Sequence, residues 1–146
     1  MSTGDLYTRL QAAFLLLDDG DRRLLARHGL TPTQLATLNA LDPFEGHRLI
    51  DIAGRLLVDK STVTRLIDRL EQQGLVQRVA DPTDRRAQRV RLTASGVARR
   101  AQAQAAHDQS IALRLGALRH TDIAYIGSLL GTLNASLQEQ LGHDTP

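Results

Sequence analysis

The chain has 146 residues, with 18 Lys or Arg against 16 Asp or Glu, so its net charge is +2. This length fits one domain, or one core with a helical extension. The absence of cysteine excludes disulfides, thiolate metal ligands and thiol redox sensing. The sequence has no apolar run of about 18 residues and no secretory signal pattern, so we expect a cytoplasmic protein without a membrane span.

Residues 6–27 carry apolar side chains at helical spacing and predict a long first helix. The sequence DDGD, residues 18–21, falls in its middle. A glycine inside a helix costs about 1 kcal/mol relative to alanine. We therefore expect this helix to kink or break at Gly20.

Residues 31–41 and 47–57 predict two shorter helices. The first has a strong start signal, because Thr31 can cap it, Pro32 fits its first position and Gln34 completes a capping box. Both helices have an apolar face, formed by Leu35, Leu38 and Leu41 in the first and by Leu49, Ile52, Ala53 and Leu56 in the second.

Residues 59–73 predict the best-defined helix, with Asp59 as its N-cap and Gly74 as its C-terminal stop. Its apolar face contains Val63, Leu66, Ile67 and Leu70, at the spacing of one helical stripe. Its polar side contains Ser61, Thr62, Thr64, Arg65, Asp68, Arg69 and Gln72.

After Gly74 the apolar pattern alternates, which predicts two strands, residues 75–80 and 87–93, joined by a turn. Arg85 and Arg86 then lie at the tip of a β-hairpin. Arg89 and Arg91, further along the second strand, are expected to contact phosphate or nothing. Residues 59–100 contain ten Lys or Arg against five Asp or Glu, a local charge of +5 that indicates an anionic partner.

Two further helices are predicted at residues 94–118 and from Thr121, as N-cap, to residue 141. Together with residues 6–17 they carry more apolar surface than one small domain needs. Exposed apolar surface of this extent is typical of an association interface, so a two-chain helical interface is expected.

Three helices followed by a basic hairpin predict a winged helix-turn-helix, in a mainly α fold with a small β-hairpin wing. Within a single chain, 1–146, residues 31–93 form the DNA-binding lobe, and residues 1–30 and 94–146 the helical dimerisation region. Helix 59–73 fits a DNA major groove, and the wing, residues 80–88, would lie at the minor groove, which attracts arginine. The candidate DNA-binding residues are Lys60, Ser61, Thr62, Thr64, Arg65, Arg69, Arg85 and Arg86, with Asp84 bracing the wing.

The segments GLTPTQLATLNAL, LIDIAGRLLVDKSTVTRLIDRLEQQGLVQR and DPTDRRAQRVRLTASG resemble the MarR family of bacterial transcription regulators. The resemblance implies a homodimer, held by the terminal helices, on a pseudo-palindromic double-stranded DNA operator. It implies a repressor of adjacent genes that a small organic effector releases, bound between the lobe and the dimerisation helices. It also implies DNA contacts from the start of helix 59–73 and from Arg86, with Asp84 bracing the wing.

Other functions are less well supported by the sequence. It has no Gly-rich phosphate loop, nucleophile elbow or HExxH motif, so an enzyme is not expected. His107 beside Asp108 is the one candidate for a metal residue, and no metal or cofactor is predicted. A winged-helix module for protein association, a regulator without a ligand and an activator stay open as alternatives.

Overall fold

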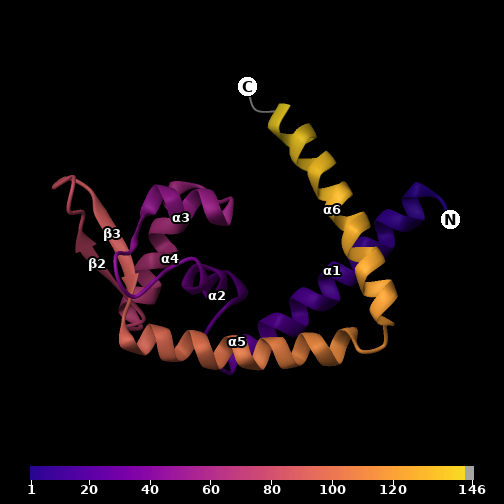
Figure 1. The fold of residues 1–146 in the computed structure, drawn as a ribbon, viewed down its shortest axis with the longest axis horizontal. Helices are drawn as coiled ribbons and strands as arrows, with labels where there is room; N and C mark the ends of the chain where they lie inside the picture. The colour runs from indigo at the N-terminus through magenta and orange to yellow at the C-terminus, as the bar shows by residue number, and fades with distance from the viewer. Residues whose placement is uncertain (144–146) are drawn as a thin grey trace. The chain divides into compact units, whose positions relative to one another are not determined.

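The computed structural model describes residues 1–143, which are mainly helical with one small sheet (Figure 1). The chain divides into two compact units, Met1–Asp108 and Gln109–Pro146. In chain order the elements are α1 (Thr3–Ala26), α2 (Pro32–Asn39), β1 (His47–Arg48), α3 (Leu49–Leu56), α4 (Lys60–Gln72), β2 (Val76–Ala80), β3 (Gln88–Leu92), α5 (Ala94–Leu115) and α6 (His120–His143). The predicted mainly α fold with a β-hairpin wing is confirmed.

Helix α1 runs through the DDGD sequence without interruption, so the predicted kink or break at Gly20 is wrong. Asp18 pairs with Arg22 at 2.8 Å and Asp19 pairs with Arg23 at 2.9 Å. Each pair joins residues four apart on one helix face, and such pairs stabilise a helix by about 0.2–0.5 kcal/mol. The acidic residues that seemed to interrupt the helix therefore offset part of the cost of the glycine.

The predicted start of α2 is confirmed in its atomic detail. The backbone N–H of Gln34 donates to Thr31 Oγ1 at 3.2 Å, and the backbone N–H of Thr31 donates to Gln34 Oε1 at 2.9 Å. Pro32 occupies the first turn, where its missing N–H leaves no bond unmade. Local chemistry thus fixes this boundary.

The third helix begins two residues later than predicted, because His47 and Arg48 form strand β1 instead. They pair with Val90 and Arg89 of β3 in an antiparallel register. The sheet is therefore three-stranded, in the order β1-β3-β2, and not an isolated hairpin. A two-residue strand has no sequence period of its own, so only its partner strand defines it.

The core of the first unit lies between α2, α3, α4 and the sheet. Its buried side chains include Leu35, Leu38, Ile52, Val63, Ile67 and Leu70 of the predicted apolar stripes, together with Leu75, Val90 and Leu92. Burial of the inner face of α4 fixes the rotation of that helix about its axis, and the polar face is left outward.

The start of α5 requires a glycine at position 96. Thr93 Oγ1 accepts from the backbone N–H of Gly96 at 3.0 Å and donates to the carbonyl of Gly74 at 2.6 Å. These two hydrogen bonds hold the start of α5 close to the end of α4. A Cβ at position 96 would therefore lie 1.9 Å from the carbonyl oxygen of Leu75.

Gly96→Ala is accordingly expected to lower the free energy of unfolding by about 3 kcal/mol, because rigid backbone must move to admit the methyl group. Denaturant unfolding followed by circular dichroism measures the change. Gly54→Ala is the matched control: a Cβ there meets nothing within 4 Å. The control is expected to gain about 0.5–1 kcal/mol from helix propensity. Equal stability of the two variants would contradict the close approach.

In the second unit α6 begins at His120, so Thr121 lies in the first turn and the predicted cap is wrong. Arg119, just before the helix, donates to both carboxylate oxygens of Asp122 at 2.8 and 2.9 Å. The side chains of Arg119 and Asp122 thus pair across the start of α6. Among the described residues, no helix is long and apolar enough to cross a membrane.

Candidate nucleic-acid interface

A tight turn at Leu57 and Val58 separates α3 from α4 and sets the direction in which α4 starts. Leu57 adopts a left-handed conformation, with φ 54°, and the backbone N–H of Val58 donates to the carbonyl of Ala53 at 3.2 Å. A left-handed residue just past a helix ends it and reverses the chain sharply. Helix α4 can therefore start only two residues after this turn, at Lys60.

Asp59 caps α4, as predicted. Its carboxylate accepts from the backbone N–H of Thr62 at 2.7 Å and from Ser61 Oγ at 2.8 Å. These hydrogen bonds favour the ionised form and lower the pKa of Asp59 to about 2. The first turn of α4 is thereby held in place at neutral pH.

The outer face of α4 is open and basic. Lys60, Ser61, Thr64 and Arg65 line an exposed hollow at its N-terminal end. Arg65 and Arg69 are exposed, and no ion pair within residues 1–143 involves either of them. Both guanidinium groups are therefore available to a partner. This arrangement is compatible with the predicted DNA contacts from this face.

The hydroxyl groups at this end of α4 are already engaged. Ser61 donates to Asp59, and Thr64 Oγ1 donates to the carbonyl of Lys60 at 2.9 Å. Either hydroxyl would have to rotate before it could donate to a phosphate. DNA contacts from Ser61 and Thr64 would therefore require an exchange of hydrogen bonds, which a contact from Arg65 would not.

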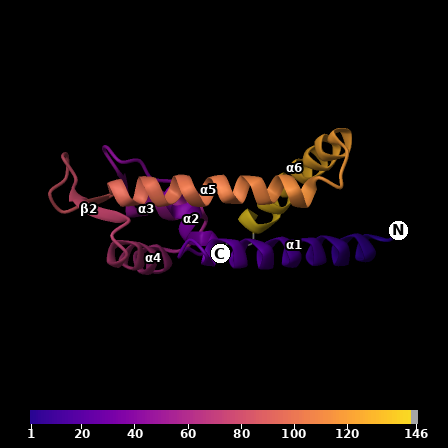
Figure 2. The ribbon, with the colours of Figure 1, turned by 90° about the horizontal axis from the view of Figure 1, so that it is seen from below.

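The β2–β3 hairpin projects beyond the helices of its unit, and α4 lies along one edge of the same unit (Figure 2). Arg85 and Arg86 are exposed at the hairpin tip. Asp84 shapes this turn through the backbone: its carboxylate accepts from the N–H of Arg86 at 3.0 Å, and its carbonyl accepts from the N–H of Ala87 at 3.0 Å. The side chain of Asp84, which was predicted to brace the wing, thus binds the backbone of the turn.

A buried carboxylate at the base of the wing escaped the sequence analysis. Asp81 Oδ2 accepts from Arg48 Nε at 2.8 Å and from Arg89 Nε at 2.9 Å, while Oδ1 accepts from the N–H and hydroxyl of Thr83 at 2.9 and 2.8 Å. Its side chain is inaccessible to solvent. Hydrogen bonds from the two arginines, and to a smaller extent those from Thr83, hold the pKa of Asp81 far below its ordinary value. The sequence signal that could have indicated a structural role for Asp81 is its place before Pro82, because aspartate followed by proline is typical of the first two positions of a turn.

The expectation for the strand arginines is corrected in the same way. Arg89 is held by Asp81, and Arg91 Nη1 donates to the carbonyl of Phe44 at 3.2 Å. Both guanidinium groups therefore bind the protein itself. The strand pattern places these arginines on an outer face but does not show their partners, which lie 8 positions away for Arg89 and 47 positions away for Arg91.

A second ion-pair cluster joins β2 to α4. Arg78 Nη2 lies 2.6 Å from Asp68 Oδ1, and Nη1 of the same guanidinium contacts the carboxylate of Glu71. The backbone N–H of Arg78 also donates to Glu71 at 3.3 Å. Arg78 thus contacts two acidic residues of α4 and offsets one of their two negative charges, while Arg65 and Arg69 form no ion pair among the described residues.

The metal alternative gains no support from His107. Its Nε2 lies 3.2 Å from Asp21 Oδ1, so it pairs α5 with α1 inside the first unit. Over residues 1–143, no group of three or more His, Cys, Asp or Glu side chains is placed to hold a metal ion.

A lobe of three helices, in which the third helix, α4, follows a tight turn and exposes its polar face, together with a three-stranded sheet that has a basic tip, defines a winged helix-turn-helix protein. The model of the MarR family matches residues 30–87. The regulator MhqR of Bacillus subtilis is 33% identical over 92 residues, which cover 63% of this chain and 63% of that protein. The regulator SarZ of Staphylococcus haemolyticus is 32% identical over 99 residues, covering 64% of this chain and 67% of SarZ. The chain belongs to the MarR family.

The match to MhqR thus spans just under two thirds of that relative's length. Among solved structures, CouR of Rhodococcus jostii bound to p-coumaroyl-CoA superimposes with a TM-score of 0.75 and 25% identity, over 88% of this chain and 91% of CouR. MhqR and SarZ are transcription regulators, which agrees with the prediction that this chain is not an enzyme.

Proposed function

We propose that this protein is a homodimeric, sequence-specific DNA-binding regulator of transcription that acts in the cytoplasm. The observation that carries the proposal is a set of exposed arginines that form no ion pair within residues 1–143, Arg65 and Arg69 on α4 and Arg85 and Arg86 on the wing. An α-helix fits the major groove, and arginine forks match guanine edges. A narrow minor groove beside it attracts the wing arginines.

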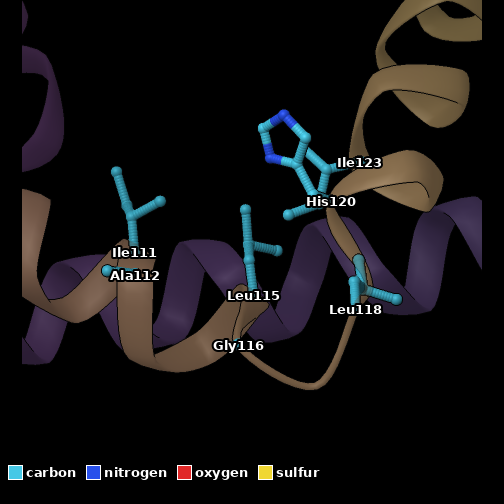
Figure 3. Close-up of a pocket in the computed structure, with 7 residues that line it drawn as sticks. All are labelled: Ile111, Ala112, Leu115, Gly116, Leu118, His120 and Ile123. Carbon is cyan, nitrogen blue, oxygen red and sulfur yellow. The ribbon is translucent and has the colours of Figure 1, made fainter.

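The apolar surface of the terminal helices supports the homodimer. None of the described side chains of α6 is fully buried in the single chain, although Leu129, Leu130, Leu133, Leu137 and Leu141 follow one another along it. At the start of α6, Ile111 and Leu115 of α5 point into the same space as His120, in a mostly apolar hollow (Figure 3). Apolar surface of this extent favours burial against another chain. A second copy offers a matching surface.

We further propose that the protein represses adjacent genes and that a small organic effector releases it from DNA. The structure of CouR with a bound acyl-CoA thioester supports an effector of this kind. Release requires an effector that binds one shape of the dimer more tightly than another. Two recognition helices must lie about 34–36 Å apart to reach successive major grooves, so a change of a few ångströms in that spacing would misplace one of them.

Titration of DNA by fluorescence anisotropy tests the proposal. The probes are the duplex directly upstream of the protein's own gene and a duplex that the protein selects from a random pool, each with unrelated duplex as competitor. We expect binding that survives the competitor and weakens steeply with salt, because each phosphate contact releases counterions. Binding to both probes no tighter than to the competitor would refute a sequence-specific regulator.

A further inference from the structure

The strand register places two arginines directly opposite each other. Arg48 of β1 pairs with Arg89 of β3, and like charges at opposed positions of a sheet repel. One carboxylate, that of Asp81, lies between them and accepts a hydrogen bond from each Nε. The β1–β3 pairing therefore depends on a residue that belongs to neither strand.

The same carboxylate reaches the turn of the wing. Besides the two arginines, it accepts from the hydroxyl and backbone N–H of Thr83 and, at 3.2 Å, from the backbone N–H of Asp84. Asp84 in turn holds the N–H of Arg86. A chain of hydrogen bonds thus runs from β1, which leads directly into α3, to the tip of the wing.

We propose that Asp81 is a positioning residue for DNA recognition, which fixes the wing arginine Arg86 relative to the helix-turn-helix. The carboxylate is inaccessible to solvent, so it cannot itself touch DNA. It acts through the strand β1 on one side and through the turn at Thr83 and Asp84 on the other. This assignment rests on the proposed DNA-binding function and names a residue that serves it.

The direction in which Asp81→Asn changes the affinity for DNA distinguishes a positioning role from a purely electrostatic one. Asp81→Asn preserves the size of the side chain and removes one negative charge close to a basic surface. If Asp81 contributed only its charge, the variant would bind polyanionic DNA more tightly. If it positions the wing, the variant binds its selected duplex more weakly despite the more favourable charge.

The experiment measures the affinity of wild type, Asp81→Asn, Arg86→Ala and the double variant for a duplex that wild type has selected from a random pool. We expect Asp81→Asn alone to bind about tenfold more weakly, as expected for one lost DNA contact. In the Arg86→Ala background it should cause no additional loss, because the contact on which it acts is already absent. Glu45→Gln, which removes a charge from an exposed side chain of the same unit, is the control and should bind at least as tightly as wild type.

Thermal unfolding by circular dichroism shows whether Asp81→Asn still folds. Arg48→Lys serves if it does not, because this variant keeps every charge but loses the Nε donor. It should weaken binding in wild type and have no effect in the Arg86→Ala background. Tighter binding by Asp81→Asn, or a loss that simply adds to that of Arg86→Ala, would overturn the positioning role. Failure of wild type to prefer its selected duplex would instead contradict the proposed function itself.

Discussion

A charge placed in the apolar stripe of α6 is expected to convert the protein to a monomer and to weaken operator binding by about a hundredfold or more, because the two half-sites then bind separate chains. Leu133→Asp makes this change. Leu133 is exposed in the single chain and lies outside the buried core cluster, so its replacement leaves that core unchanged. In a dimer the new carboxylate would be buried without a partner, which costs several kcal/mol.

Sedimentation velocity measures the mass, and the anisotropy titration measures the affinity on the same samples. Ser128→Asp is the matched control, since Ser128 lies on the opposite side of the same helix and is also exposed. It adds the same charge and should leave a dimer with unchanged affinity. A dimeric Leu133→Asp variant with wild-type affinity would show that this stripe is not the interface.

Arg65→Ala is expected to lose discrimination at one base pair of each half-site, worth about 1–3 kcal/mol. The reason is the fork of two N–H donors that a guanidinium presents to the O6 and N7 atoms of guanine. Affinities for the selected duplex and for duplexes with single base-pair changes measure the effect. With the alanine variant, one of these changes should cease to matter.

Arg65→Lys separates a base contact from a phosphate contact. It keeps the charge but presents a single point donor in place of the planar fork. If Arg65 reads a base, the lysine variant should keep the salt dependence of wild type and still lose discrimination at that pair. If both variants discriminate between base pairs as well as wild type does, Arg65 does not contact a base.

The sequence alone determined the features that depend on neighbouring residues. The capping box of Thr31 and Gln34, the cap of Asp59 and the stop at Gly74 are all confirmed. The change from helical to alternating period correctly predicted the hairpin, in which Val90 and Leu92 are buried. These features follow from local hydrogen bonding and from the period of each element, so a short window of sequence contains their cause.

Two predictions from local sequence were wrong where ion pairs between side chains three or four residues apart stabilise a helix. The glycine of DDGD predicted a break in α1, but its acidic neighbours pair with Arg22 and Arg23 one turn later. The start of α6 was assigned to the hydroxyl of Thr121, whereas Arg119 and Asp122 form the first-turn contacts. Propensity is a weak preference that a few pairings can outweigh.

Only the tertiary structure decided how the wing is attached to the helices. Strand β1 exists because β3 lies beside it, and Asp81 meets Arg48 across 33 positions of sequence. Arg78 likewise joins β2 to the acidic residues of α4. A charged side chain in a sequence carries no mark of whether it will face solvent or a distant partner. Burial then makes that partner necessary, because an unpaired charge inside the fold costs several kcal/mol.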